Sequence, residues 1–501
     1  MHYPFWDTQA GYGVLMASIA VVHVFVSHFA IGGGLYLVIA EHLARRAADE
    51  EHLVYLKRLT RFFALTTLVF GALTGVGIWF VIGLISPTAT EVLIHHFVWG
   101  WAIEWTFFVV EITAAILYYT RWDKISPRNH LILGWLYFAA AWLSLFVING
   151  ILTFMLTPGR WMETGSVIDG FFNPTMWPSL VFRTGVCIML AGLYAMLIAA
   201  RYPAGRFKAA RVRYNACWGL TGLAVMVLSF RWYWTAIPDA IRETAQTALV
   251  TPMAALQAAG GFSLILAATF VLLGLLVPRR MHVATATLMM LVGLGLFSGF
   301  EMFRESIRKP FIITGYIYGN GLPVAMQPMI RQDGCLPHIA YRTGDDAADI
   351  FRHACRSCHT WSGYKPLQPA FEGTDRAFIA SIVFHTDLLK ATMPPFPGTK
   401  EEANLVAGHI HAMTDKRPFA ETRGLRGPAL GAKAWAVRCG ICHEFGGYRD
   451  VTDALSGIRP DDDGQLHGMA GCVADGALRF SVDSVERQAL IAYISARNEE
   501  Q

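Results

Sequence analysis

The sequence predicts an all-α protein, in which a bundle of about eight membrane-spanning helices precedes a soluble α-helical region. Two observations support this class. Hydrophobic residues make up 54% of the chain and charged residues only 16%, and the mean hydropathy is +0.40, whereas soluble domains carry about 25% charged residues. The apolar residues also cluster between about residues 13 and 303, while the remainder has an ordinary soluble composition.

Eight apolar runs are long enough to cross a bilayer as helices. The first is too long for the apolar core of a signal peptide and lacks a small-residue cleavage site, so we expect it to remain as a span. The runs cover residues 13–41, 60–85, 97–120, 131–156, 177–200, 214–237, 251–277 and 283–303.

Basic residues are concentrated in alternate connections between these runs. The first, third, fifth and seventh connections carry Lys and Arg, for example Arg45 and Arg46, whereas the second ("SPTATEVLIHH") carries none. The positive-inside rule places the basic connections in the cytoplasm. Both termini then lie on the outer face of a bacterial inner membrane. The net charge of +4 gives no support for a nucleic-acid partner.

Two CxxCH motifs stand in the C-terminal region, at Cys355, Cys358 and His359 and again at Cys439, Cys442 and His443. This spacing lets two thioethers hold one edge of a porphyrin while the following imidazole reaches the iron. A chance match or a zinc site is the alternative, but zinc needs further Cys or His pairs at ligand spacing. We therefore predict two covalent c-type haems. Such haems are attached outside the cytoplasm, which agrees with the predicted orientation.

The C-terminal region has the pattern of a duplicated cytochrome c domain, with a CxxCH near the start of each half and a helical pattern near its end. The domain prediction is a membrane domain over 1–310, a Gly- and Pro-rich linker over 311–339, and cytochrome c domains over 340–420 and 421–501. Met393, in "ATMPPFPGTK", resembles the methionine ligand loop of class I cytochromes c. Met469 is the candidate for the second haem, with His467 as its rival.

The remaining cysteines carry weaker expectations. Cys187 and Cys217 fall in apolar runs and are expected to be inert core thiols. Cys335 and Cys472 flank the haem motifs and are candidates for a disulfide in an oxidising compartment.

Several ionisable residues lie inside the apolar runs, where they are costly and are functional candidates by default. Imidazole and carboxylate groups can ligate haem iron, and paired acids can relay protons. The alternative is a side chain at the interface or one hydrogen-bonded within the bundle. The residues are His23, His28, Glu104, Glu111, Glu301 and Glu305.

The stretches "HVFV…GGGLYLVIAEH", "GALTGVGIWFVIG", "WAIEWTFFVVEI…RWDKIS" and "LSLFVINGILT" resemble subunit I of the cytochrome bd oxygen reductases. The resemblance covers most of residues 1–310. It implies a helical bundle with one or two non-covalent b- or d-type haems that reduces dioxygen to water. It also implies that His23 ligates an active-site haem and that Glu104, with a one-residue slip, and Glu111 are the catalytic glutamates. The family's later glutamate falls at Ser298, and Glu301, one turn along, is the stand-in.

The departures from the family concern its electron inlet. The family's low-spin b haem, which takes electrons from quinol, is ligated by a histidine and a methionine, and these positions correspond here to Arg183 and Gln257, neither of which is a usual haem ligand. The quinol-binding loop has shrunk to about fifteen residues around "IPDAIRETAQTA". The resemblance is therefore to a divergent branch that lacks the quinol site and carries a dihaem cytochrome c domain.

The function expected from this combination is a terminal oxidoreductase fed by a cytochrome c-type donor. Electrons would pass through the c haems to the haems in the bundle, which His23 and Glu301 would ligate or flank. Glu111 would lie on the proton path, and a partner like bd subunit II would pack alongside. Two alternatives stay open. One is reduction of nitric oxide or another small oxidant, and the other is an electron-transfer subunit without catalysis of its own.

Overall fold

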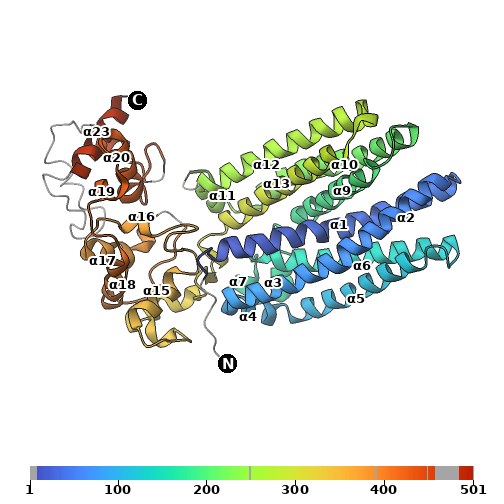
Figure 1. Ribbon diagram of the computed structural model, residues 1–501. Helices are drawn as coiled ribbons and strands as arrows, with labels where there is room; N and C mark the ends of the chain where they lie inside the picture. The colour runs from blue at the N-terminus through green and yellow to red at the C-terminus, as the bar shows by residue number, and fades with distance from the viewer. Residues whose placement is uncertain (1–7, 248–249, 390–391, 448, 457–484, 500–501) are drawn as a thin grey trace.

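The computed structural model describes residues 8–247, 250–389, 392–447, 449–456 and 485–499. A bundle of long helices occupies the N-terminal part of the chain, and shorter helices form a second part at one end of the bundle (Figure 1). The first helix starts at this same end, so the start of the bundle and the C-terminal part lie together.

Seven helices of the described chain are long and apolar enough to cross a membrane, and a bent pair raises the number to eight. With the bent pair included, these helices correspond to the eight predicted runs. The seven are α1 (Tyr12–Arg46), the continuous segment α2, η1 and α3 (Glu50–Ala64, Leu65–Gly71 and Ala72–Ile85), α5 (Val98–Thr120), α6 (Pro127–Phe154), α9 (Met176–Ala199), α12 (Val250–Thr269) with η2 (Phe270–Leu276), and α13 (Val283–Ile307). The bent pair is α10 (Arg206–Ala236) with α11 (Asp239–Thr247), which meet at 106°.

Helix α2 begins ten residues before the apolar run that predicts it. The Asp49 side chain caps it by accepting a hydrogen bond from the backbone N–H of His52 at 2.9 Å. Its first turns are amphipathic, with Tyr55 and Leu56 buried and Lys57 exposed. The basic residues near position 57 therefore lie on a helix, although the sequence analysis placed them in a connection.

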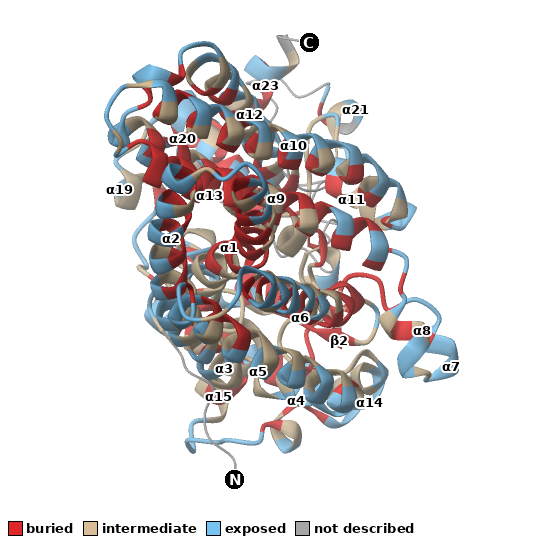
Figure 2. Ribbon diagram, turned by 90° about the vertical axis from the view of Figure 1, so that its right-hand side faces the viewer, coloured by how far each residue is buried: buried red, intermediate tan, exposed pale blue. Residues whose placement is uncertain are grey.

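Helices α1 and α9 form the centre of the bundle, and α3 and α5 form its outside (Figure 2). The glycine run near the middle of α1 permits this close packing. A Cβ atom on Gly32 would lie 1.8 Å from the carbonyl oxygen of Cys187 on α9, and one on Gly34 would lie 2.2 Å from the ring of Tyr137 on α6. Cys187 is buried as expected, but Cys217 is exposed on α10, because its side chain faces away from α9 and the core.

The predicted linker is folded against the bundle. Strands β1 (Phe311–Ile313) and β2 (Ile317–Tyr318) pair antiparallel, and Ile313 and Ile317 pack with Phe97, Phe154 and Trp161 of the bundle. The other short segments at this end are α4 (Pro87–His96), α7 (Trp161–Thr164), α8 (Val167–Phe171), η4 (Val324–Met326), α14 (Gln327–Asp333) and η5 (Leu336–His338), while η3 (Pro278–Arg280) joins η2 to α13.

Two small helical units follow. The first contains α15 (Asp346–Cys355), α16 (Gln368–Phe371), α17 (Arg376–Phe384), η6 (Thr386–Leu388) and α18 (Lys400–Met413). The second contains α19 (Phe419–Arg423), α20 (Gly427–Ala434), η7 (Trp435–Cys439), α21 (Thr452–Leu455) and α23 (Val485–Glu499). Each unit has a hydrophobic core of its own. Both predicted haem-attachment motifs lie at the C-terminal end of a helical segment, α15 in one unit and η7 in the other.

Candidate haem sites and buried polar residues

The first CxxCH motif forms a tight turn after α15. The backbone N–H groups of Cys358 and His359 both donate to the carbonyl oxygen of Cys355, at 3.2 and 3.0 Å. The Nδ1 atom of His359 lies 3.0 Å from the carbonyl oxygen of Lys365. A carbonyl only accepts, so Nδ1 carries the proton, and Nε2 is left as the nitrogen that can bind a metal.

The second motif repeats this geometry with the same offsets. Cys442 and His443 donate from their backbone N–H groups to the carbonyl of Cys439 at 3.0 and 2.9 Å. Nδ1 of His443 lies 2.9 Å from the carbonyl oxygen of Arg449, again six residues along. Lys365 and Arg449 both have positive φ, 47° and 44°, which is uncommon for residues other than glycine.

This repeated geometry fits two c-type haems. In both motifs the second cysteine and the histidine lie in one hydrogen-bonded turn that begins at the first cysteine. A backbone carbonyl fixes the tautomer and orientation of the histidine that would bind iron. The shared left-handed residue supports a duplication that the sequence shows only weakly. The residue types at this position, Lys and Arg, do not favour positive φ, so this shared conformation could not have been predicted from the sequence.

Met393 lies in a loop held against the first unit. Its half-buried side chain packs against the same hydrophobic core as Cys355. Thr386 donates its hydroxyl to the carbonyl of Pro394 at 2.9 Å, and Gln327 donates its side-chain amide to the carbonyl of Phe396, also at 2.9 Å. The segment directly after the methionine is thus fixed by two hydrogen bonds. Met469, His467 and Cys472 lie outside the described residues, and Cys335, the proposed partner of Cys472, is buried.

The first motif borders the membrane bundle. A Cβ atom on Gly13 would lie 2.8 Å from the ring of Tyr364, and one on Gly11 would lie 2.8 Å from Cγ2 of Thr360. The N-terminal end of α1 therefore rests directly on the residues that follow His359. On another side, a Cβ atom on Gly319 of the linker would lie 3.3 Å from Sγ of Cys358.

The second motif borders the first unit. Cys442 belongs to the hydrophobic core of the first unit, and Arg449 donates to the carbonyl of Leu388 at 2.7 Å. Arg438, just before the motif, donates to the carbonyls of Ala370 and Glu372 at 2.8 and 2.5 Å. The contacts therefore run from the bundle to the first motif and from the first unit to the second motif.

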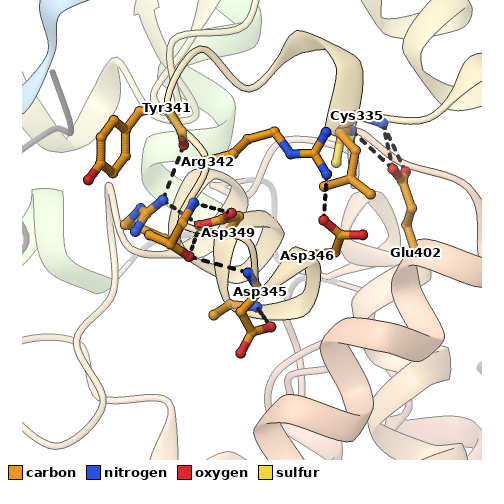
Figure 3. Close-up of polar contacts among 11 residues, drawn as sticks. Cys335, Tyr341, Arg342, Asp345, Asp346, Asp349 and Glu402 are labelled. Carbon is orange, nitrogen blue, oxygen red and sulfur yellow. Dashed lines mark hydrogen bonds and ion pairs between the residues drawn. The ribbon is translucent and has the colours of Figure 1, made fainter. Parts of the chain in front are cut away.

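Two buried carboxylates hold the scaffold around the first motif (Figure 3). Glu402 accepts hydrogen bonds from the backbone N–H groups of Cys335, at 2.9 and 3.0 Å, and Leu336, at 3.1 Å, so it ties the linker to α18. Asp349 on α15 accepts from the backbone and hydroxyl of Thr343 at 2.7 and 2.8 Å and from Arg352 at 2.6 Å. Helix α15, which ends in Cys355, is positioned by these contacts.

Substituting Asp349→Asn should destabilise the first unit by about 2 kcal/mol, because a buried charge-assisted network is broken. The matched control is Asp346→Asn, which breaks only a half-exposed ion pair with Arg342 and should cost less than about 1 kcal/mol. Thermal unfolding followed by far-ultraviolet circular dichroism, and by the Soret signal of the predicted c-type haems, measures both. Equal effects of the two substitutions would contradict this assignment.

The contribution of Asp349 should also depend on pH. Burial favours the neutral acid, but the hydrogen bonds from Thr343 and the charge of Arg352 outweigh it and hold the pKa of Asp349 below its usual value. A carboxyl group with a lowered pKa stabilises the folded state above its unfolded pKa, about 4, and this stabilisation is lost as the pH falls below that value.

Within the bundle, His23 faces α3. Its Nδ1 atom lies 3.1 Å from the hydroxyl oxygen of Thr74, and that hydroxyl is 2.8 Å from the carbonyl of Phe70. The single hydroxyl proton goes to the carbonyl, so Thr74 accepts from Nδ1–H of His23. The nitrogen that remains for a metal is Nε2, as in the two CxxCH motifs. The π-helical turn η1 directly precedes this part of α3, and such turns are frequent at functional sites.

The two glutamates of α5 face α6. Glu104 accepts a hydrogen bond from the hydroxyl of Ser144 at 2.8 Å. Glu111 lies 3.2 Å from the hydroxyl of Tyr137, which is also 2.9 Å from the carbonyl of Ala30 on α1. Both glutamates are on the inner face of α5, as their seven-residue spacing predicts.

Glu301 lies on the other side of α1, in a network of buried charges. Arg183 donates to one of its carboxylate oxygens at 3.2 Å, and Arg304 donates to the other at 3.0 and 2.7 Å. Arg183 also contacts Nε2 of His28 at 3.4 Å. Both carboxylate oxygens of Glu301 are thus hydrogen-bonded to arginine, and an iron-ligating role for Glu301 stays a prediction.

Arg183 and Gln257 do not face a common site. Arg183 is buried between α1 and α13 and engaged with Glu301, whereas Gln257 is exposed on α12. The guanidinium group of Arg183 is engaged with Glu301 and His28 at the position where the resemblance expects a haem-ligating histidine.

A fourth buried group, which was not among the predicted site residues, lies at the end of the bundle away from the CxxCH motifs. Glu41 on α1 is fully buried, accepts hydrogen bonds from Arg45 and Tyr118, and lies 2.8 Å from Nδ1 of His130. A glutamate within the first apolar run was the signal that could have found it, by the same reasoning that singled out Glu104 and Glu111.

Comparison with known proteins supplies a family for part of the bundle. Residues 14–234 match the family described as cytochrome bd terminal oxidase subunit I. Among solved structures, the bd oxidase from Geobacillus thermodenitrificans is similar with a TM-score of 0.53 and 15% sequence identity, over 61% of this chain and 88% of that one. No curated protein sequence matches the chain. The family match includes His23, Glu104, Glu111 and Arg183 but ends before Gln257 and Glu301.

Proposed function

We propose that this chain, whose residues 14–234 match cytochrome bd terminal oxidase subunit I, is a membrane terminal oxidoreductase that receives electrons through c-type haems and reduces dioxygen to water in its helix bundle. The family match implies a multi-pass membrane oxidoreductase with haem cofactors. The c-type haems, their donor and the reaction in this bundle are our proposal.

The observation that carries the proposal is the contact between the first CxxCH motif and α1. Tyr364 and Thr360, which follow His359, touch the N-terminal end of the helix that bears His23. Electron transfer between cofactors requires that they lie close together, and this contact brings the two predicted haem sites toward each other along one helix.

The residues that would hold the haems follow from the geometry above. Cys355, Cys358, His359 and Met393 would hold one c-type haem, and Cys439, Cys442 and His443, with Met469 as the predicted sixth ligand, would hold the other. His23 would ligate a non-covalent b- or d-type haem in the bundle, and Glu104 and Glu301 would flank it or a neighbouring one. Bound haem would supply one-electron carriers in the C-terminal region and an oxygen-binding iron in the bundle.

The chain's own groups have separate tasks in this proposal. The carbonyls of Lys365 and Arg449 hold the imidazoles of His359 and His443 in one tautomer, and Thr74 does the same for His23. Glu111, with Tyr137, would hold and pass protons toward Glu104. Arg183, engaged with Glu301, leaves no imidazole at the position where the family resemblance expects a haem ligand.

The proposal also includes the outer components. The C-terminal units would lie on the outer, periplasmic side of the inner membrane, where a cytochrome c-type donor reaches the second motif first. Helices α3 and α5 expose apolar side chains such as Trp99 and Trp105. This surface is available to lipid or to a partner like bd subunit II.

An oxygen-electrode assay of the purified protein tests the proposal. Reduced cytochrome c should support oxygen consumption at a rate at least about tenfold above that with ubiquinol or menaquinol, a difference of about 1.4 kcal/mol in barrier. Consumption of nitric oxide but not oxygen would instead favour the small-oxidant alternative. Rapid quinol oxidation by a protein that lacks residues 340–501 would overturn the proposal.

A further inference from the structure

Three polar contacts join α5 to α6 at regular intervals. The partners on each helix are seven residues apart, so successive contacts are separated by about 10 Å along the bundle. The contacts are Tyr118 with His130, Glu111 with Tyr137, and Glu104 with Ser144. The last two contain the glutamates already assigned to proton transfer, and the first lies near the end of the bundle away from the CxxCH motifs (Figure 1).

His130 shares a proton with Glu41. Its Nε2 atom is 2.9 Å from the backbone carbonyl of Tyr118, which only accepts, so Nε2 is protonated. Its Nδ1 atom lies 2.8 and 2.9 Å from the two carboxylate oxygens of Glu41. This contact needs one proton, which belongs either to the imidazole or to the acid. Both side chains are fully buried, so the pair holds an exchangeable proton away from solvent.

Arg45 connects this pair to the surface. Its Nε donates to Glu41 at 2.6 Å, and its side chain is 22% exposed. An open groove beside it is lined on one part by His42, Arg45, Arg46 and Arg128 and on the other by the apolar residues Pro127, Leu131, Ile132 and Trp135. The charged and titratable groups that face the pair are Arg45 from α1 and the Tyr118 hydroxyl from α5, which donates to Glu41 at 2.6 Å. The Tyr118 and Trp122 rings cover the imidazole.

We propose that Glu41 and His130 form a proton-loading station, which takes protons from the Arg45 groove and passes them by way of Glu111 to Glu104. The inference rests on the proposed function, because the protons are those consumed with dioxygen. Each transfer moves one proton and no electrons: the pair releases a proton toward Glu111 and regains one from water at the groove. Water molecules between the contacts would carry the proton across each interval of about 10 Å.

The test uses the full-length protein in vesicles, with reduced cytochrome c supplied at the C-terminal side. The pH is varied only in the compartment that faces Arg45. Wild-type oxygen consumption should fall as this pH rises. Glu41→Gln should lower the rate at least about tenfold and abolish the dependence on that pH. Glu41→Asp, which retains a titrating carboxyl group, should restore the dependence. His130→Gln serves as a second variant with the same expectation as Glu41→Gln.

Tyr36→Phe is the matched control. It removes a buried hydrogen bond of 2.6 Å from another face of α1, to Asn215 on α10, without touching the pair. It should keep both the rate and the pH dependence. Wild-type behaviour in Glu41→Gln and His130→Gln, or a slow rate that keeps the wild-type pH dependence, overturns the inference and leaves a structural ion pair. A wild-type protein that consumes no oxygen with cytochrome c overturns the proposed function instead.

Discussion

Replacing Cys355 and Cys358 together with alanine should reduce oxygen consumption driven by cytochrome c by at least about a hundredfold, equivalent to about 2.7 kcal/mol in barrier. In the proposed function the two thiols attach the porphyrin at the motif that rests on α1, and the other CxxCH motif lies beyond it, against the first unit. Carbon monoxide binding by the reduced protein, which reports the bundle haem, should persist. The oxygen electrode and a carbon monoxide difference spectrum measure the two results.

The corresponding double substitution at Cys439 and Cys442 is the control for the order of the motifs. It should also stop turnover with cytochrome c, but a small reductant, such as ascorbate with a phenylenediamine mediator, should restore turnover because it can reach the first motif directly. The same reductant should not restore the Cys355/Cys358 variant. Rescue of both variants, or of neither, would contradict the order that the contacts assign.

Replacing His23 with alanine should abolish carbon monoxide binding and lower oxygen consumption to the background of the assay, a loss of at least about a hundredfold. The reason is that the side chain offers Nε2 as a ligand from the interior of the bundle, and alanine offers none. The spectra of the covalent haems should be unchanged, since their attachment residues lie in the C-terminal units. Thr74→Val should give a milder loss of about 10- to 100-fold, because it removes only the acceptor that orients the imidazole.

His28→Gln is the control on the same helix. His28 is buried like other bundle residues, but its ring contacts Arg183 and the carbonyl of Val24, not α3. Carbon monoxide binding should survive this substitution. If His28→Gln removes the binding and His23→Ala does not, the iron lies on the α9 and α13 side of α1, and the assignment of His23 is wrong.

The buried charges around Arg183 bear on the predicted change of the electron inlet. A buried arginine needs a partner of opposite charge, and Glu301 provides one, while the two terminal nitrogens of Arg183 contact Glu301 and His28. The family resemblance alone showed that two expected ligands had changed. The structure adds that one of them is tied into a network and that the other, Gln257, faces outward.

Much of the fold followed from the sequence. All eight apolar runs correspond to helices, because a segment in a bilayer must satisfy its backbone internally and length and hydropathy therefore decide it. Helix ends were less predictable, as α2 shows, because amphipathic turns outside the lipid extend a helix without adding to an apolar run. The CxxCH motifs needed only local spacing, and Glu104 and Glu111 needed only helical periodicity to share a face.

The sequence by itself determined which segments are apolar enough to enter the membrane and which residues have the spacing of a covalent haem site. It also showed which ionisable groups are costly to bury in the bilayer and are therefore functional candidates. Only the tertiary structure decided which of these groups meet: the first motif with the end of α1, Glu301 with two arginines, and His130 with Glu41. The physical reason is that spans and attachment motifs depend on neighbours along the chain. Proton sharing and charge pairing depend on side chains brought together from distant helices, such as Arg183 and Glu301, which are 118 residues apart.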